Sequence, residues 1–293
     1  MSGAQRSLAP VAMNLLGVVE HPVLGETPYR VDRDGRPYVP AGDGGIVLGL
    51  QLGDSVFALA ADHAAPGACL VHPDPASRLA LATYACIGNR AEARTGAASG
   101  ARGVVIGKRG EAGRVITAFA QADLARLRPG DQVTVRACGQ GWRPPGFPAD
   151  VTIMNVDPEL LSALPVETGG SGEVVTAGVR VQLPGRLAGN GIGRPAAGWD
   201  LDLQLTPATP GALAGPGELV LGDLVAVTDI DARYNLGYRR GWVTVGVVGH
   251  GASPQPGHGP GITPILTGPA TALRATPDAA RHVGLTPAAL KLQ

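Results

Sequence analysis

The sequence is poor in aromatic residues and in charge, and its charges cancel. Aromatic side chains make up 4% and charged side chains 16% of the 293 residues, with 24 Lys plus Arg against 24 Asp plus Glu. This neutral balance argues against nucleic acid or an anionic membrane surface as the main partner. Long apolar runs are also missing, and none approaches the roughly 18 residues that a membrane-spanning helix needs. We therefore expect neither a nucleic-acid partner nor a membrane.

Cysteine is scarce as well. Cys69, Cys86 and Cys138 are an odd number and lack the close pairing of cysteine metal sites. Three such residues do not make a disulfide framework, so reduced thiols and a cytoplasmic location are expected.

Glycine and proline, by contrast, are abundant. The 44 Gly and 26 Pro are scattered between short apolar runs, and 44% of the chain is hydrophobic. Many short strands joined by tight turns predict a mainly-β (α+β) fold with two β-barrel-like or sandwich modules and a few short helices. The polar stretch "VETGGSGE" at residues 166–173 favours a linker. It divides the chain into a β-rich domain at 1–165 and a second at 173–293 with short C-terminal helices.

Local signals place some of these elements. The segment Pro75–Asn89 fits a buried helix, with Leu79 among its apolar positions and Gly88 as its stop. Asp157 is expected to cap a short helix that runs to Leu164. Residues 100–119 are typical of a hairpin, and one or two short C-terminal helices are expected, starting at Thr276 and Thr286.

The stretch "TDIDARYNLGYRRG" at 228–241 is unusually polar for a connection between two strands. Asp229 and Asp231 are two residues apart, so they share one face of a strand. Their repulsion would be relieved by a metal, by a substrate amine, or by the arginines that follow. Tyr238 and Arg239 would return opposite them. The alternative is a solvated hairpin held by exposed ion pairs, which contribute little each.

Three histidines also stand in turn-rich motifs. Asp62 and His63 lie in "ADHAAPG", and "GHGASPQPGHGPG" holds His250 at the end of a strand and His258 in a loop. Histidine can act as acid, base or metal ligand near neutral pH. The alternative is that Asp62 caps a turn and His63 lies on the surface.

Two asparagines complete the candidates. Asn190 lies in the glycine-rich loop "GNGIGR", where backbone N–H groups could approach a ligand, although a plain loop is the simpler reading. Asn89 follows Cys86 in "ACIGN", where a capping role for Asn89 and a packed core position for Cys86 are the alternatives to function.

The motifs "HPVLG", "AGDGGIVL", "GDSVFALAADHAAPG", "ACIGN", "ARGVVIGKRG", "ACGQG", "NVDPELL", "GNGIG" and "GHGPG" occur in an order that resembles a bacterial and archaeal family of unknown function from thermophile structural genomics. The resemblance covers roughly Leu15 to Leu266 and implies no particular activity. It loosely implies a cyclophilin-like barrel in the N-terminal part. The family pattern at the polar hairpin resembles Asp-x-Asp-Asn-x-x-Gly-x-Gly-Tyr-Arg-Lys-Gly, from which this chain departs at Ala232, Leu236 and Arg240.

These patterns predict a small-molecule enzyme with acid–base chemistry, metal-assisted or not, in a cleft between the two halves. Hydrolysis, cyclisation or elimination of an amide or amino-acid-like substrate is expected, with secondary metabolism as one setting. A non-catalytic ligand-binding or regulatory protein is the alternative. No organic cofactor is expected, a divalent metal is left open, and strand edges favour a homo-oligomer. The expected catalytic residues are Asp62, His63, Asp229 and His258, and the expected substrate-binding residues are Asn89, Asn190, Asp231, Tyr238, Arg239 and His250.

Overall fold

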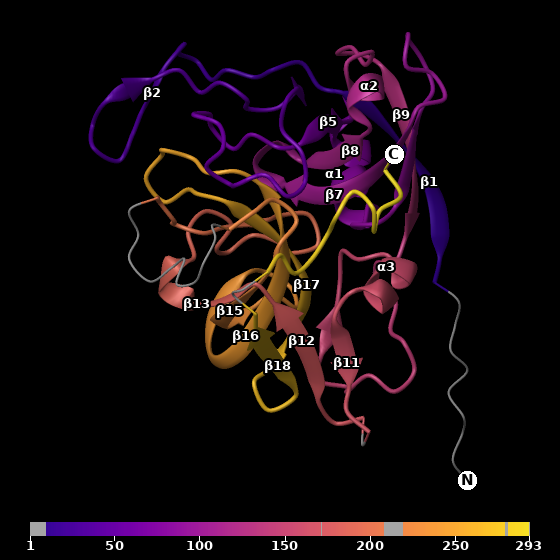
Figure 1. Ribbon diagram of the computed structural model, residues 1–293, viewed down its shortest axis with the longest axis vertical. Coiled ribbons are helices and arrows are strands. Elements are labelled where there is room, and N and C mark those ends of the chain that lie inside the picture. Colours follow the sequence, from indigo (N-terminus) through magenta and orange to yellow (C-terminus); the bar gives the residue numbers. More distant parts are fainter. Residues whose placement is uncertain (1–9, 171, 208–218, 279–280, 293) are drawn as a thin grey trace.

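The computed structural model describes residues 10–170, 172–207, 219–278 and 281–292, and it confirms a mainly-β fold (Figure 1). The helices are short: α1 (Pro75–Tyr84), α2 (Gln121–Leu124), α3 (Pro158–Ala163) and the 3-10 turns η1 (Gly110–Ala112) and η2 (Gly185–Leu187). No helix in the described part of the chain is long and apolar enough to cross a bilayer.

The N-terminal half forms a closed antiparallel barrel. Its strands, in spatial order, are β1 (Ala12–Val19), β9 (Gln132–Cys138), β6 (Arg90–Ala93), β7 (Arg102–Arg109), β8 (Arg114–Phe119) and β5 (Gly67–Val71). The barrel closes because β1 also pairs with β5, with Val18 opposite Val71 and Val19 opposite Leu70. The short strand β4 (Ile46–Val47) pairs with β5 in antiparallel fashion, and β2 (Arg30–Val31) pairs with β3 (Pro37–Tyr38) outside the barrel.

Alternation in the sequence accounts for the barrel interior. In β9 the side chains of Val133, Val135 and Ala137 are buried, and the residues between them are not. This period of two puts one face of the strand against the core. The predicted hairpin at 100–119 is confirmed as β7 and β8, whose side chains are buried almost throughout.

The two predicted N-terminal helices have different outcomes. Asp157 caps α3 by accepting from the backbone N–H of Glu159, as expected. Helix α1, however, ends at Tyr84 rather than running on toward Asn89, and Leu79 on it is exposed. The helix stops early because the Asn89 side chain accepts from the Cys86 N–H and folds residues 86–89 into a turn.

The C-terminal half is built on a six-stranded sheet. Its strands are β10 (Thr152–Ile153), β17 (Gly261–Pro269), β16 (Gly237–His250), β15 (Leu224–Asp231) and β13 (Val181–Pro184), with β14 (Leu201–Asp202) also paired to β17. The long strands β15, β16 and β17 are coloured orange to yellow in Figure 1. A second sheet contains β11 (Val166–Thr168), β12 (Val175–Val179) and β18 (Leu273–Pro277).

Three expectations for this half are corrected. The segment expected as a linker begins with β11, which pairs with β12; residue 171 lies outside the described residues. Thr276 lies in β18 and starts no helix, because that segment pairs with β12 along the sheet edge. After Thr286 the chain forms hydrogen-bonded turns rather than a helix.

The two halves meet where β7 of the barrel crosses the β16–β17 ribbon. Gly107 and Gly249 face each other so closely that a Cβ on Gly107 would lie 3.0 Å from the Gly249 Cα. The backbone N–H of Lys108 donates to Thr263 Oγ1 across this contact at 2.9 Å. Arg109, two residues after Gly107, and His250, the residue after Gly249, therefore lie in the same region.

Candidate functional site

The site begins with the register of three neighbouring strands. Gly261 of β17 is paired with Asp202 of β14 on one side and with His250 of β16 on the other. A Cβ on Gly261 would lie 1.9 Å from His250 Nε2 and 2.6 Å from Asp200 Oδ2. Only glycine leaves room here for the imidazole to reach the two carboxylates.

Asp200 and Asp202 are two residues apart, with the buried Leu201 between them. Strand geometry puts both carboxylates on the same side, toward His250. His250 Nε2 lies 2.8 Å from Asp200 Oδ2 and 3.5 Å from Asp202 Oδ1. The sequence predictions missed this pair, although "WDLDLQL" carries the same Asp-x-Asp spacing that drew attention to Asp229 and Asp231.

His63 reaches this group from the N-terminal half. It has a left-handed backbone with φ of 53°, a rare conformation outside glycine, and its N–H donates to Ala252 O. Its ring Nδ1 lies between an acceptor, Asp62 Oδ1 at 2.6 Å, and a donor, Arg109 Nη2 at 3.1 Å. The ring proton can thus sit on either nitrogen. With Nδ1 protonated, Nε2 presents its lone pair to the site.

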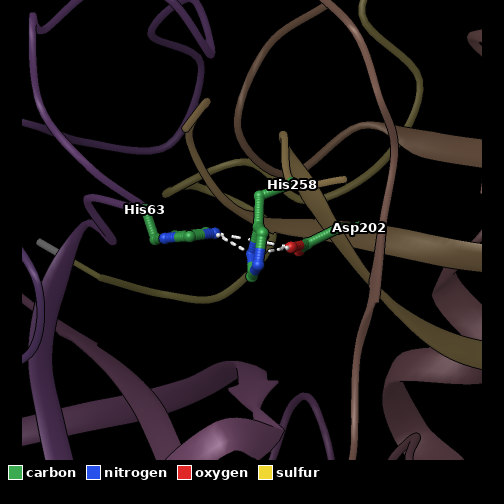
Figure 2. Close-up of side chains that lie close together, drawn as sticks. All are labelled: His63, Asp202 and His258. Atoms are coloured by element: carbon green, nitrogen blue, oxygen red, sulfur yellow. Dashed lines mark hydrogen bonds and ion pairs between the residues drawn. The ribbon is translucent and has the colours of Figure 1, made fainter. Parts of the chain in front are cut away.

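His258 completes the cluster from the loop after β16. Its Nδ1 lies 2.9 Å from Asp202 Oδ2 and 3.1 Å from His63 Nε2, which is itself 3.4 Å from Asp202 Oδ2. Figure 2 shows the His258 ring between the His63 ring and the Asp202 carboxylate, each carried by a different segment of the chain. The structure therefore brings together His63, His250 and His258, which the sequence had singled out separately.

A layer of ion pairs surrounds His63. Asp43 contacts Arg109, Arg30 at 3.1 Å and Arg114 at 3.5 Å. Asp62 Oδ2 accepts from Arg30 at 3.0 Å, as well as from the Tyr38 hydroxyl at 2.8 Å and Gln255 at 3.2 Å. These contacts fix the Asp62 carboxylate beside the ring and leave Arg30 and Arg109 paired with acids.

The pKa values of the cluster result from two opposing effects, burial and hydrogen bonds to oppositely charged partners. Burial alone would lower the pKa of His250, but its hydrogen bonds to Asp200 and Asp202 outweigh this and raise the pKa to about 10. The pKa of His258 is raised in the same way, against burial, by Asp202. Burial would raise the pKa of the Asp202 carboxyl, but the three histidines hold it well below its usual range. Buried carboxylates here depend on a positive charge, whether a proton or a cation.

One side of the cluster reaches solvent. The side chain of His258 is 17% exposed and that of Glu111 33%, whereas His63 and Asp202 are almost fully buried. Glu111 accepts from Arg109 at 3.1 Å and from the Asn190 side chain at 2.9 Å. A ligand would thus approach past Glu111, Asn190 and His258.

The polar hairpin between β15 and β16 makes its own contacts. Asp231 pairs with Arg233 at 2.8 Å and Arg239 at 3.2 Å, and both guanidinium groups lie over the Trp242 ring. Asp229 accepts from the N–H of Gly241, and Tyr238 is largely exposed. No hydrogen bond or ion pair within the described residues joins this hairpin to the histidine cluster. The departures Ala232 and Leu236 are both buried in an apolar cluster.

Asn89 occupies a structural position. Its Oδ1 accepts from the N–H groups of Cys86 and Cys138, and its Nδ2 donates to Cys138 O and Asp157. Burial raises the pKa of the Cys86 thiol to about 11. These groups hold the end of α1 against β9 and the start of α3, and none of their hydrogen bonds involves the histidines.

The donor set fits a divalent metal ion. Ligand atoms bound about 2.0–2.2 Å from one ion lie roughly 2.9–3.5 Å from one another. The three distances among His63 Nε2, His258 Nδ1 and Asp202 Oδ2 are 3.1, 2.9 and 3.4 Å. Two imidazoles and one carboxylate suit zinc, manganese or iron rather than calcium.

Comparisons with known proteins place the chain without assigning it an activity. The model of the N-terminal domain of unknown function DUF4438 matches residues 29–162, and that of the C-terminal domain matches residues 163–284. A solved structure described as the crystal structure of TM1086 is 33% identical. The match between the two structures covers 94% of this chain and 95% of the other, with a TM-score of 0.87. No curated protein matches the chain. The cyclophilin-like likeness stays a prediction.

Proposed function

The chain belongs to the DUF4438 family, and we propose that it is a metal-dependent enzyme that hydrolyses a small amide or amino-acid-like substrate. His63 Nε2, His258 Nδ1 and Asp202 Oδ2 bind the ion. The observation that carries the proposal is that these three atoms lie 2.9–3.4 Å apart, the spacing of ligands around one ion.

The surroundings of His63 support a ligand role. Metal-binding histidines generally donate their second N–H to a carboxylate, which fixes the ring. Asp62 Oδ1 is buried 2.6 Å from His63 Nδ1, which places it to accept that N–H. Asp62 acts as a positioning residue, itself held by Arg30 and Tyr38.

The chemistry follows from the open side of the site. A bound divalent ion polarises a carbonyl oxygen and lowers the pKa of a coordinated water to near neutrality. Glu111 Oε1 lies 3.8 Å from His258 Nδ1, one of the proposed ligand atoms, and would serve as the general base beside the ion. Because Arg30 and Arg109 are already paired with acids, the site suits a neutral amide better than an anionic group.

Metal analysis and a substrate screen test the proposal together. Wild-type protein without an affinity tag, loaded with Zn²⁺ or Mn²⁺ and dialysed, is expected to retain at least one ion per chain by mass spectrometry. His63→Ala and His258→Ala are expected to weaken binding at least tenfold, while His72→Ala, away from the cluster, leaves it unchanged.

Turnover separates the enzyme from the alternative of a non-catalytic metal-binding protein. A panel of chromogenic amides and amino-acid amides is expected to reveal hydrolysis that disappears with chelator and returns with metal. In Glu111→Gln, turnover is expected to fall by roughly 10²–10⁴-fold, the usual contribution of a general base, while metal content stays the same. Metal retention without turnover of any amide would contradict the enzymatic proposal and favour binding alone.

A further inference from the structure

The two oxygens of the Asp202 carboxylate face different histidines. Oδ2 lies 2.9 Å from His258 Nδ1, on the side that also holds His63. Oδ1 lies 3.5 Å from His250 Nε2, on the side that holds Asp200. One carboxylate is therefore shared by two groups of candidate ligands, and a bridging carboxylate has this arrangement.

The second group is a complete donor set in its own right. One atom from each of Asp200, Asp202 and His250 lies within 4.8 Å of the other two, and all three residues are buried. His250 Nδ1 lies 2.9 Å from the Gly251 carbonyl oxygen, which places the ring proton on Nδ1. A metal ion would take the place of the proton on Nε2, whose lone pair would then face it together with the two carboxylate oxygens.

The charges around Asp200 and Asp202 also favour a bound cation. Asp43 and Asp62 each have an arginine partner. In the part of the chain that the structure describes, the ion pairs of Asp200 and Asp202 are made with histidines alone. The second Asp200 oxygen accepts from the Gly110 N–H at 2.8 Å, which orients the carboxylate without neutralising it.

Space for the ligands is built into the sheet. Gly261 lies between Asp202 and His250 in register, and any side chain there would fill the volume that the imidazole and Asp200 share. The rings of His63 and His250 are neighbours, with centroids 5.1 Å apart. The two donor sets are thus adjacent and share Asp202, as the ligands of two-metal hydrolytic sites do.

We propose that Asp200, His250 and the bridging Asp202 bind a second divalent transition-metal ion, so that the site is dinuclear. This inference rests on the proposed function, because the first ion at His63 and His258 shares Asp202. The buried second ion orients the bridge and adds positive charge, while the first, on the exposed side, meets the substrate.

Metal stoichiometry and magnetic coupling test the second ion. Wild-type protein titrated with Zn²⁺ in equilibrium dialysis is expected to bind two ions per chain. Asp200→Asn keeps the oxygen that accepts from Gly110 but removes the charge, and it is expected to bind one. The control Asp131→Asn, a buried turn carboxylate of the barrel that accepts from the Arg128 N–H, is expected to bind two.

Wild-type protein with two equivalents of Mn²⁺ provides a measurement that needs no variant. Its electron paramagnetic resonance spectrum is expected to show exchange coupling between the ions. The second site would be overturned, and the first left intact, if wild type binds one ion, Asp200→Asn binds as many ions as wild type, and the Mn²⁺ spectrum shows no coupling. No ion in wild type would overturn both proposals.

Discussion

At the scale of single residues, Gly261 determines whether His250 can face the two carboxylates. Its backbone pairs with both flanking strands, and its missing side chain is the space into which the imidazole and Asp200 fit. The site thus depends on a residue that offers no chemistry of its own.

Gly261→Ala is expected to destabilise the protein by about 1–3 kcal/mol, the usual range for overpacking a tight interior. The added methyl group would overlap His250 Nε2 and displace the ring. Urea unfolding measures the free energy. Gly237→Ala is the matched control, because a Cβ there meets only Asn235 O at 3.7 Å. Equal unfolding free energies of the two variants would show that the space between Gly261, His250 and Asp200 is not close-packed.

Sequence reasoning at this scale selected the right residue types more readily than the right neighbours. Asp62, His63, His250 and His258 were each recognised from local motifs, and the fold brings them together. Asp200 and Asp202 were missed because "WDLDLQL" reads as a plain strand. Strand register alone, which pairs Asp202 with Gly261 and Gly261 with His250, shows that this Asp-x-Asp faces a histidine.

At the scale of elements, the β15–β16 hairpin carries the same Asp-x-Asp spacing in a different setting. Its aspartates are matched within the loop by Arg233, Arg239 and the Gly241 N–H. No sequence rule distinguishes charges neutralised locally from charges that await a ligand, since the difference lies in which strands come to flank them.

Asp231→Asn is expected to change the unfolding free energy by less than about 1 kcal/mol, because its two arginine partners are 32% and 51% exposed and solvent screens such surface ion pairs. Zn²⁺ content is expected to stay at the wild-type value. Denaturant titration and metal analysis of the same preparation measure both. Loss of Zn²⁺ in this variant would mean that the hairpin belongs to the site after all.

The C-terminal segment is fastened to the start of β15 by a second histidine–carboxylate contact. His282 Nδ1 lies 2.8 Å from Asp223 Oδ1, and its Nε2 lies 2.8 Å from Leu285 O. Acceptors at both ring nitrogens favour the imidazolium. The hydrogen bond to Asp223, opposed by partial burial, raises the pKa of His282 above its ordinary value.

Because the folded pKa of His282 is the higher one, this contact contributes full stability below the unfolded pKa of about 6.5 and loses it as pH rises through the folded pKa. The stability difference between wild type and His282→Gln is therefore expected to be largest below pH 6.5 and to shrink at higher pH. Thermal unfolding across pH 5–9 measures it, with His21→Gln as an exposed control. A difference that grows with pH would contradict the imidazolium assignment.

At the scale of the whole molecule, the barrel and the C-terminal sheets share one core. A single apolar cluster contains Ile87, Ile106 and Ile116 of the first half together with Val245, Val247 and Leu266 of the second. The mainly-β class could be predicted from composition and turn spacing. The closure of the barrel could not, because Val18 pairs with Val71 through contacts that no local pattern encodes.

This shared core predicts one cooperative unfolding transition rather than two. Calorimetry in the presence of chelator, which removes any contribution from metal binding, is expected to give a calorimetric enthalpy equal to the van't Hoff enthalpy. Two resolved transitions would show that the halves at either side of residue 163 are stable independently. The homo-oligomer and the cytoplasmic location stay predictions.

The central claim is that His63, His258 and Asp202 hold a metal ion, and anomalous diffraction from Zn²⁺-soaked crystals tests it most directly. Data on both sides of the zinc absorption edge are expected to show a peak about 2.0–2.2 Å from His63 Nε2, His258 Nδ1 and Asp202 Oδ2. Absence of such a peak at full Zn²⁺ saturation, with the two imidazoles and the carboxylate hydrogen-bonded directly to one another, would contradict it.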